Sequence, residues 1–194
     1  MTTPNGNSPR SRLQAIARRV MIERGLAPDF SPSAMAELEA VRSAPQSADP
    51  ATRDLRRLLW CSIDNDDSRD LDQLSVAEAL PDGATKLYVA IADVTAVVKP
   101  GSALDDHARQ NTTSVYTAGQ IFPMLPEKLS TDLTSLNPDV ERLALGVERT
   151  WSVDAALFYS AVYPATLRNR AKLAYNSLAG WFEGTAPIPP AASA

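Results

Sequence analysis

Hydrophobic residues near the N-terminus recur at helical spacing. Leu13, Ile16 and Val20 fall on one face of a helix, and Gly25 is a suitable stop. A second helix is expected after Ser31 and Pro32, because serine caps helix N-termini and proline is favoured at the first helical position. The pattern therefore predicts two short helices ahead of a linker that begins at Ser43.

Short strand-like runs replace this pattern from Leu58 onward. They are "LLWCSI", "LSVAEAL", "KLYVAIADV", "LALGVERTW" and "ALFYSAVY". The "PDGA" stretch at Pro81 is typical of a hairpin turn, and the strands are expected to be mostly antiparallel. Tyr175, Leu178 and Phe182 are spaced as one face of a helix that begins around Arg170.

These elements predict an α+β fold, in which a mostly antiparallel β portion with flanking helices follows a short helical N-terminal segment. Residues 1–10 are polar and rich in proline, glycine and serine, so we expect a disordered leader there. The helical segment and its linker occupy residues 11–50, the main domain residues 51–184, and a proline- and alanine-rich tail residues 185–194. A chain of 194 residues can bury one ordinary core.

Composition narrows the classes of function. No stretch approaches the roughly 18 apolar residues of a membrane span, and the N-terminus lacks the apolar core of a signal peptide. We therefore expect a cytoplasmic protein without a membrane partner. Cys61 is the single cysteine, which excludes an internal disulfide, and its apolar setting predicts a buried, inert thiol.

The formal net charge of −4 excludes binding of nucleic acid by bulk positive charge alone, so any RNA contact must be local. Basic residues gather in three runs, each of which could be only a solvated face, as is usual for such runs. These runs are Arg10, Arg12, Arg18 and Arg19; Arg53, Arg56 and Arg57; and Arg168, Arg170 and Lys172. The lone histidine, His107, is predicted on a helix surface rather than at a site.

Aspartates crowd into "SIDNDDSRDLDQL", residues 62–74, which we call the acidic segment. They are Asp64, Asp66, Asp67, Asp70 and Asp72. So many carboxylates repel one another unless water or a cation relieves them. If residues 70–73 are extended, Asp70 and Asp72 point to one side while Leu71 faces the core. Oxygen ligands without histidine or cysteine suit a hard cation such as Mg²⁺ or Mn²⁺.

A calcium loop and a solvated turn are the alternatives to a magnesium site in the acidic segment. A calcium loop starting at Asp64 would need glycine at its sixth position and glutamate at its twelfth, where Arg69 and Ser75 stand, so this motif is excluded. A solvated acidic turn between two strands stays open, because aspartate and asparagine are ordinary turn residues.

The acidic segment resembles the signature of the RNB family, whose catalytic domain defines ribonuclease II and its relatives. That signature runs Asp, five residues, Asp, an apolar residue, then Asp-Asp. Asp64, Asp70 and Asp72 match its first three acids, whereas Gln73 stands at the fourth. The stretches "SVYTAGQIFPMLPEKLSTDLTSLNP" and "RNRAKLAYNSL" are also similar to family segments and occur in the expected order.

The resemblance implies processive hydrolysis of single-stranded RNA from its 3′ end, with Mg²⁺ or Mn²⁺ as cofactor and nucleoside 5′-monophosphates as products. It implies metal binding by Asp64, Asp70 and Asp72, with Asp70 and Asp72 also positioning the attacking water. Gln73 departs from the pattern, because an amide oxygen can ligate a cation but brings no charge.

RNA-binding residues are also implied by the resemblance. Tyr116 matches a tyrosine that stacks on a base near the 3′ end, and Tyr175 matches one near the terminal nucleotide that is associated with preference for ribose. Arg168, Arg170 and Lys172 match the basic residues that precede the second of these tyrosines, Tyr175, in the family. Judged by spacing alone, both tyrosines could instead be core aromatics.

The family's catalytic domain continues past the point that corresponds to Ala194. The resemblance therefore implies the N-terminal portion of a longer enzyme, and we expect little or no activity from these 194 residues alone. A second hypothesis is a non-catalytic RNA-binding or regulatory derivative of the same fold, which Gln73 would fit.

Overall fold

The computed structural model describes residues 8–193, which form two units. One unit combines residues 8–42 with residues 97–128, and the other combines residues 43–96 with residues 129–193. The acidic segment lies entirely in the second unit. Within residues 8–193, no helix has both the length and the apolar character that a membrane span requires.

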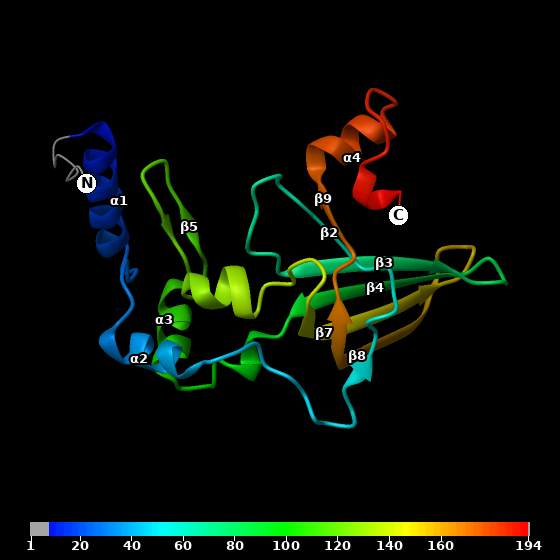
Figure 1. Ribbon diagram of the computed structural model, residues 1–194, viewed down its shortest axis with the longest axis horizontal. Coiled ribbons are helices and arrows are strands. Elements are labelled where there is room, and N and C mark those ends of the chain that lie inside the picture. Colours follow the sequence, from blue (N-terminus) through cyan, green and yellow to red (C-terminus); the bar gives the residue numbers. More distant parts are fainter. Residues whose placement is uncertain (1–7, 194) are drawn as a thin grey trace. The chain divides into compact units, whose positions relative to one another are not determined.

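The first unit contains helices α1 (Pro9–Glu23), α2 (Pro32–Ala40) and α3 (Ala103–Asn111), with a hairpin of β5 (Val115–Tyr116) and β6 (Ile121–Phe122) (Figure 1). Both predicted N-terminal helices are confirmed. The hydroxyls of Ser8 and Ser31 cap α1 and α2, and proline follows each. Of the leader predicted for residues 1–10, residues 1–7 lie outside the described part, and Pro9 already belongs to α1.

The prediction that His107 lies on a helix surface is wrong. Its side chain is buried in α3, its ring contacts that of Phe30 with 4.1 Å between centroids, and Nε2 lies 3.1 Å from Nδ2 of Asn111. Leu104, His107 and Asn111 recur at three- and four-residue spacing and form the buried face of the helix. Burial lowers the pKa of His107, so the imidazole is neutral at physiological pH.

In the described part of the second unit, a seven-stranded sheet has the order β1-β8-β7-β4-β3-β2-β9. Its strands are β1 (Arg53–Asp54), β2 (Cys61–Asp64), β3 (Gln73–Ala79), β4 (Thr85–Ala92), β7 (Glu141–Trp151), β8 (Leu157–Arg168) and β9 (Ala171–Ala174). Most neighbours are antiparallel, while β1 is parallel to β8 and β2 to β9. The predicted α+β class with a mostly antiparallel sheet is confirmed.

The turn predicted at Pro81 is confirmed as the connection between β3 and β4. Leu80 N donates to the carbonyl of Ala84 at 2.8 Å, and Gly83 has a φ of 79°, which favours glycine. Short helical turns complete the chain: η1 (Val94–Ala96), η2 (Lys128–Leu133) and η3 (Pro190–Ala192).

The helix predicted from about Arg170 begins later. Residues 171–174 form β9, and helix α4 spans Tyr175–Phe182. Ala171 and Leu173 alternate into the core while β9 pairs with β2, so strand pairing takes these residues away from the helix.

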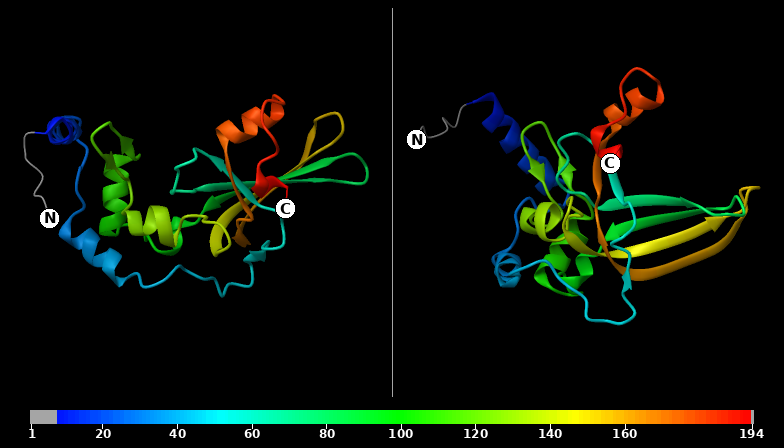
Figure 2. Two further views of the ribbon diagram at one scale, coloured as in Figure 1. Left: turned by 45° about the horizontal axis from the view of Figure 1, so that its top comes forward. Right: turned by 45° about the vertical axis from the view of Figure 1, so that its right-hand side comes forward.

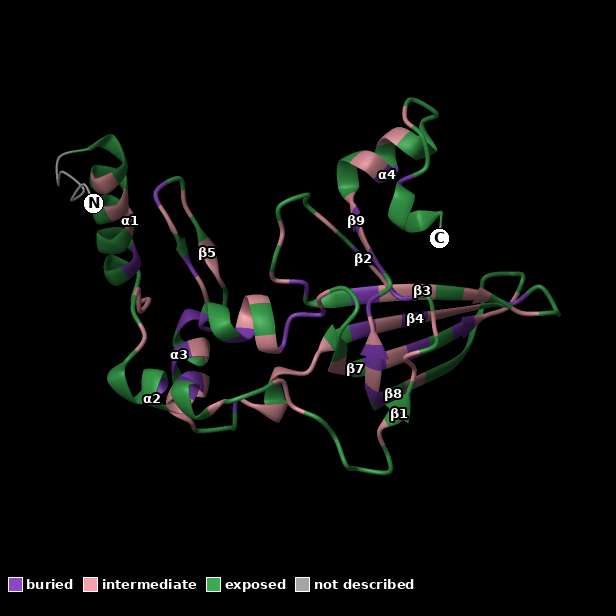
Figure 3. Cartoon of the chain, viewed as in Figure 1, coloured by how far each residue is buried: buried purple, intermediate pink, exposed green. Residues whose placement is uncertain are grey.

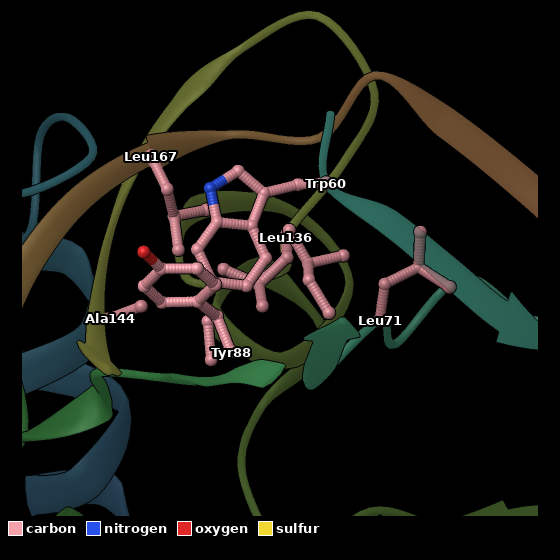
Figure 4. Close-up of a cluster of buried hydrophobic side chains, with 8 residues drawn as sticks. Trp60, Leu71, Tyr88, Leu136, Ala144 and Leu167 are labelled. Carbon is pink, nitrogen blue, oxygen red and sulfur yellow. The ribbon is translucent and has the colours of Figure 1, made fainter. Parts of the chain in front are cut away.

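A buried apolar cluster lies beneath the acidic segment (Figure 4). Trp60 is fully buried, lies edge-on to the ring of Tyr88, and donates its indole N–H to the carbonyl of Leu55 at 2.9 Å. Leu71, near the C-terminal end of the acidic segment, joins the same cluster. Buried positions alternate with less buried ones along β7 and along the later half of β8, and Ala144 and Leu167 contribute side chains from these strands to the cluster. Figure 3 colours each residue by its burial.

A buried carboxylate ties several strands together. Glu148 on β7 accepts hydrogen bonds from Arg53 at 3.0 Å and Tyr163 at 3.0 Å, and forms an ion pair with Lys86 at 3.1 Å. Burial raises the pKa of Glu148, but the hydrogen bonds from Lys86 and Tyr163 and the positive charges outweigh it. The pKa therefore lies below its ordinary value.

Glu148→Gln is expected to lower the free energy of unfolding at pH 7 by about 1–3 kcal/mol. A carboxylate with a depressed folded pKa contributes fully above its unfolded pKa of about 4.3 and loses that contribution as pH falls through the folded pKa. Urea denaturation from pH 7 down to pH 3 should show the difference between wild type and variant narrowing. A difference that stays constant with pH would contradict this assignment.

Candidate functional site

The acidic segment reaches the sheet at two places. Asp64 ends β2, and Asp72 directly precedes Gln73, the first residue of β3. The antiparallel register pairs Cys61 with Ser75, and continuing it would set Asp64 opposite Asp72. Beyond the Cys61–Ser75 pair, however, β2 runs across the direction of β3, so the two strands separate before Asp64 and Asp72 (Figure 1).

A pocket of about 160 Å³ occupies this separation. Its lining residues are Cys61, Ile63, Asp64, Asp72, Gln73, Ser75 and Tyr175. Asp64 is half-buried, whereas Asp72 and Gln73 are exposed. Leu71 faces the core as the extended pattern predicts, but Asp70 is not among the residues that line the pocket. The structure thus brings two of the three predicted carboxylates, and the amide, to one place.

We call residues 65–72, the turn that follows Asp64 and ends with Asp72, the acidic loop. One carboxylate oxygen of Asp64 accepts hydrogen bonds from the backbone N of Asn65 and from the hydroxyl of Ser68, both at 2.8 Å. Lys172 on β9 donates its Nζ to the carbonyls of Asp66 at 3.2 Å and Ser68 at 2.6 Å. The start of the acidic loop is therefore held by Asp64 and Lys172, as in an ordered Asp-rich turn.

Tyr175 reaches the pocket through the parallel pairing of β9 with β2. This register sets Ala174 against Asp64, and Tyr175 follows as the first residue of α4. Figure 2 shows α4 continuing from the end of β9. The tyrosine is 54% exposed, which leaves its ring accessible at the rim of the pocket instead of in the core.

The remaining RNA-binding residues predicted from sequence lie elsewhere. Tyr116 belongs to the β5–β6 hairpin of the first unit and is 63% exposed. Arg168 at the end of β8 donates to Glu141 at 3.2 Å, and Arg170 donates to the carbonyl of Arg56 at 2.9 Å. None of these three lines the pocket of Asp64 and Asp72.

The donors around the pocket fit a hard cation. Among residues 8–193, no three His, Cys, Asp or Glu side chains gather closely enough to hold a metal ion. Two carboxylates and an amide oxygen do share the pocket, and Mg²⁺ is ordinarily held by one or two carboxylates together with water and substrate phosphates. Oxygen donors with room for a phosphate therefore match magnesium better than a metal ion that takes all of its ligands from the protein.

Cys61 does not add a soft ligand to this set. It is half-buried, less than the full burial expected from sequence, and donates its thiol to the carbonyl of Ser75 at 3.4 Å. Burial raises the pKa of the thiol, so it remains protonated, and a thiol in that state is a poor metal ligand.

Sequence reasoning missed a group of buried polar residues within and beside the acidic segment. Ser62, Ser135 and Asn169 are 2%, 2% and 1% exposed. These residue types are ordinary in turns, so no local pattern singles them out. The available signal was that each residue lies in one of the three stretches that carry the family resemblance: Ser62 begins the acidic segment, Ser135 lies in "TSLNP" and Asn169 lies in "RNRAKLAYNSL".

Comparison with known proteins gives consistent matches. The model of the RNB domain family matches residues 52–192. Ribonuclease R of Vibrio parahaemolyticus is 42% identical over 140 residues, which cover 72% of this chain and 17% of the relative. Ribonuclease R of Escherichia coli K12 is 42% identical over 134 residues, which cover 69% of this chain and 16% of the relative.

A solved structure matches over nearly the whole chain. Mycoplasma genitalium RNase R in complex with ribose-methylated single-stranded RNA gives a TM-score of 0.81 at 26% identity, covering 95% of this chain and 28% of that one. The chain thus spans about a sixth of the length of the two curated relatives that it matches.

Proposed function

The chain belongs to the RNB domain family, and from that premise we propose that it supplies part of the active site of a 3′-to-5′ exoribonuclease. The substrate is single-stranded RNA, the products are nucleoside 5′-monophosphates, and the cofactor is Mg²⁺, with Mn²⁺ as a substitute. The observation that carries this proposal is the shared pocket of Asp64, Asp72 and Gln73 beside an exposed tyrosine.

Each group at the pocket has a chemical task in phosphodiester hydrolysis. Asp64, Asp72 and Gln73 would hold the cation through oxygen atoms, and Asp72, the more exposed acid, would also orient the attacking water. Asp70, close by in sequence, is proposed to assist in both tasks. When bound, magnesium neutralises charge on the phosphate and favours formation of hydroxide.

RNA is proposed to enter with its 3′-terminal nucleotide at Tyr175. An exposed aromatic ring stacks on any base, which suits an enzyme that removes nucleotides regardless of sequence. Tyr116, an exposed ring in the first unit, is proposed to stack on a base near the 3′ end. Arg168 and Arg170 are proposed to contact phosphates, whereas Lys172 acts mainly through the carbonyls of the acidic loop.

The experiment that tests this proposal is a segment exchange. The matching 134-residue segment of Escherichia coli ribonuclease R is replaced by that of this chain, and release of mononucleotides from single-stranded RNA is measured with and without Mg²⁺. Metal-dependent release supports the proposal. A folded hybrid that binds RNA without cleaving it favours the non-catalytic alternative. The isolated chain is expected to release little.

One observation favours that alternative, a non-catalytic RNA-binding derivative. The pocket contains a neutral amide at Gln73 where the family signature has an acid, so it offers one negative charge fewer to a cation. A loss of charge at this point weakens metal binding without disturbing the fold or the exposed tyrosines.

Gln73→Asp is expected to raise the affinity of the chain for Mn²⁺ about tenfold, because a third negative charge would face the same pocket. Isothermal titration with Mn²⁺ measures the change. Gln73→Ala is the matched variant and should weaken binding by removing the amide oxygen. Equal affinities in all three proteins would show that residue 73 does not contact the cation.

A further inference from the structure

The backbone of Leu71, in the acidic segment, is held by a loop that is distant in the sequence. Leu71 N donates to the hydroxyl of Ser135 at 3.1 Å, and Leu136 N donates to the carbonyl of Leu71 at 2.7 Å. The Ser135 hydroxyl in turn donates to the carbonyl of Arg69 at 2.9 Å. Both polar backbone groups of Leu71 are therefore fixed, and Leu71 stands between the two aspartates at positions 70 and 72.

The same loop is connected to β2 through Asn169. Its amide nitrogen Nδ2 donates to the carbonyl of Leu136 at 2.9 Å and to the hydroxyl of Ser62 at 3.1 Å. Its Oδ1 accepts from the backbone N of Ala171 at 3.1 Å. Ser62 lies on β2 two residues before Asp64. We call Ser62, Ser135, Leu136 and Asn169 the buried bridge.

The loop that carries Ser135 is itself anchored. Arg142 donates to the carbonyls of Ser135 and Asp132, each at 3.0 Å, and Asn137 donates to the carbonyl of Thr131 at 3.1 Å. Because this loop is held in place, the Ser135 hydroxyl can fix the position of the Leu71 backbone to which it is bonded.

Pairing between β2 and β3 does not reach Asp64 and Asp72, because it is made at Cys61 and Ser75. The carboxylates of Asp64 and Asp72 also repel each other across the pocket. We propose that Ser135 and Asn169 are positioning residues, which hold the Asp70–Asp72 segment and β2 at a fixed separation through the buried bridge. The consequence for metal binding rests on the proposed function.

Hydrogen–deuterium exchange of the 194-residue chain tests the bridge directly. Ser135→Ala should speed exchange in residues 66–74 by about tenfold or more, while peptides from β7 and β8 stay unchanged. The matched control is Thr134→Val, which removes a neighbouring buried hydroxyl that donates to the carbonyl of Leu129 and not to the acidic segment. Unchanged exchange in residues 66–74 of Ser135→Ala would overturn the proposal.

Ser62→Ala keeps the experiment decisive if Ser135→Ala does not fold. It removes the last link of the buried bridge while Asn169 still donates to Leu136. Exchange should then rise in residues 61–66, although less than in Ser135→Ala. A rise spread evenly over the whole sheet would indicate general destabilisation and would overturn the positioning role.

Titration with Mn²⁺ separates this inference from the proposed function. Ser135→Ala should bind Mn²⁺ about tenfold more weakly than wild type, whereas Ser135→Thr, which keeps the hydroxyl, should restore affinity. If the wild-type chain binds no Mn²⁺ while exchange changes as expected, the metal proposal fails and the bridge stands. If affinity is the same in Ser135→Ala and wild type, the bridge does not position metal ligands.

Discussion

Asp72→Asn is expected to reduce mononucleotide release by the hybrid enzyme at least about a hundredfold. Asp72, the residue directly before β3, lines the pocket, and its side chain is exposed. Asparagine keeps the shape of the side chain but removes one of the two negative charges that Asp64 and Asp72 bring to the pocket. Initial rates at saturating RNA and a range of Mg²⁺ concentrations measure the effect.

Asp67→Asn is the control for this prediction. Asp67 is an exposed acid in the same acidic loop and is not among the residues that line the pocket. Its replacement changes the net charge of the loop by the same amount, so activity should stay within about twofold of the parent hybrid. Equal losses in both variants would attribute the effect to overall loop charge and contradict a specific role for Asp72.

Trp60→Ala is expected to lower the free energy of unfolding by about 3–5 kcal/mol. The indole is fully buried between Leu71, Tyr88 and neighbouring apolar side chains, and its N–H is bonded to the carbonyl of Leu55. The replacement leaves a cavity in the core and removes the hydrogen bond from the indole, although the carbonyl of Leu55 still accepts from the backbone N of Leu58. Urea denaturation followed by far-UV circular dichroism measures the loss.

Trp181→Ala provides the comparison, because this tryptophan on α4 is 37% exposed and contacts Phe182. Trp181→Ala should lower the free energy of unfolding by less than half as much as Trp60→Ala. Similar values for the two variants would mean that the cluster around Trp60 is not the main source of stability in the second unit.

Much of the local structure could be predicted because its signals are local. Serine followed by proline marked the start of α2, and the glycine of "PDGA" marked the turn between β3 and β4. The start of the last helix was predicted wrongly because residues 171–174 fit both the helical and the strand periodicity. Ala171 and Leu173 suit a strand or the first turn of a helix, and pairing with β2 decides for the strand.

The errors about side-chain surroundings have a related origin. His107 was expected on a surface because its neighbours in "LDDHARQ" are polar, yet the ring is covered by Phe30. Helical position gives the direction of a side chain only relative to its own helix. Which other element covers that direction depends on contacts far along the chain.

The sequence by itself determined the chemistry available to the site: an acidic segment with oxygen donors, Gln73 in place of an acid, and motifs that identify the family. The tertiary structure alone decided which of these groups share a pocket. Tyr175 arrives because β9 pairs with β2 more than 100 residues earlier in the chain, and Ser135 holds Leu71 across 64 residues. Residue types set what a side chain can do, whereas long-range backbone pairing sets what it can reach.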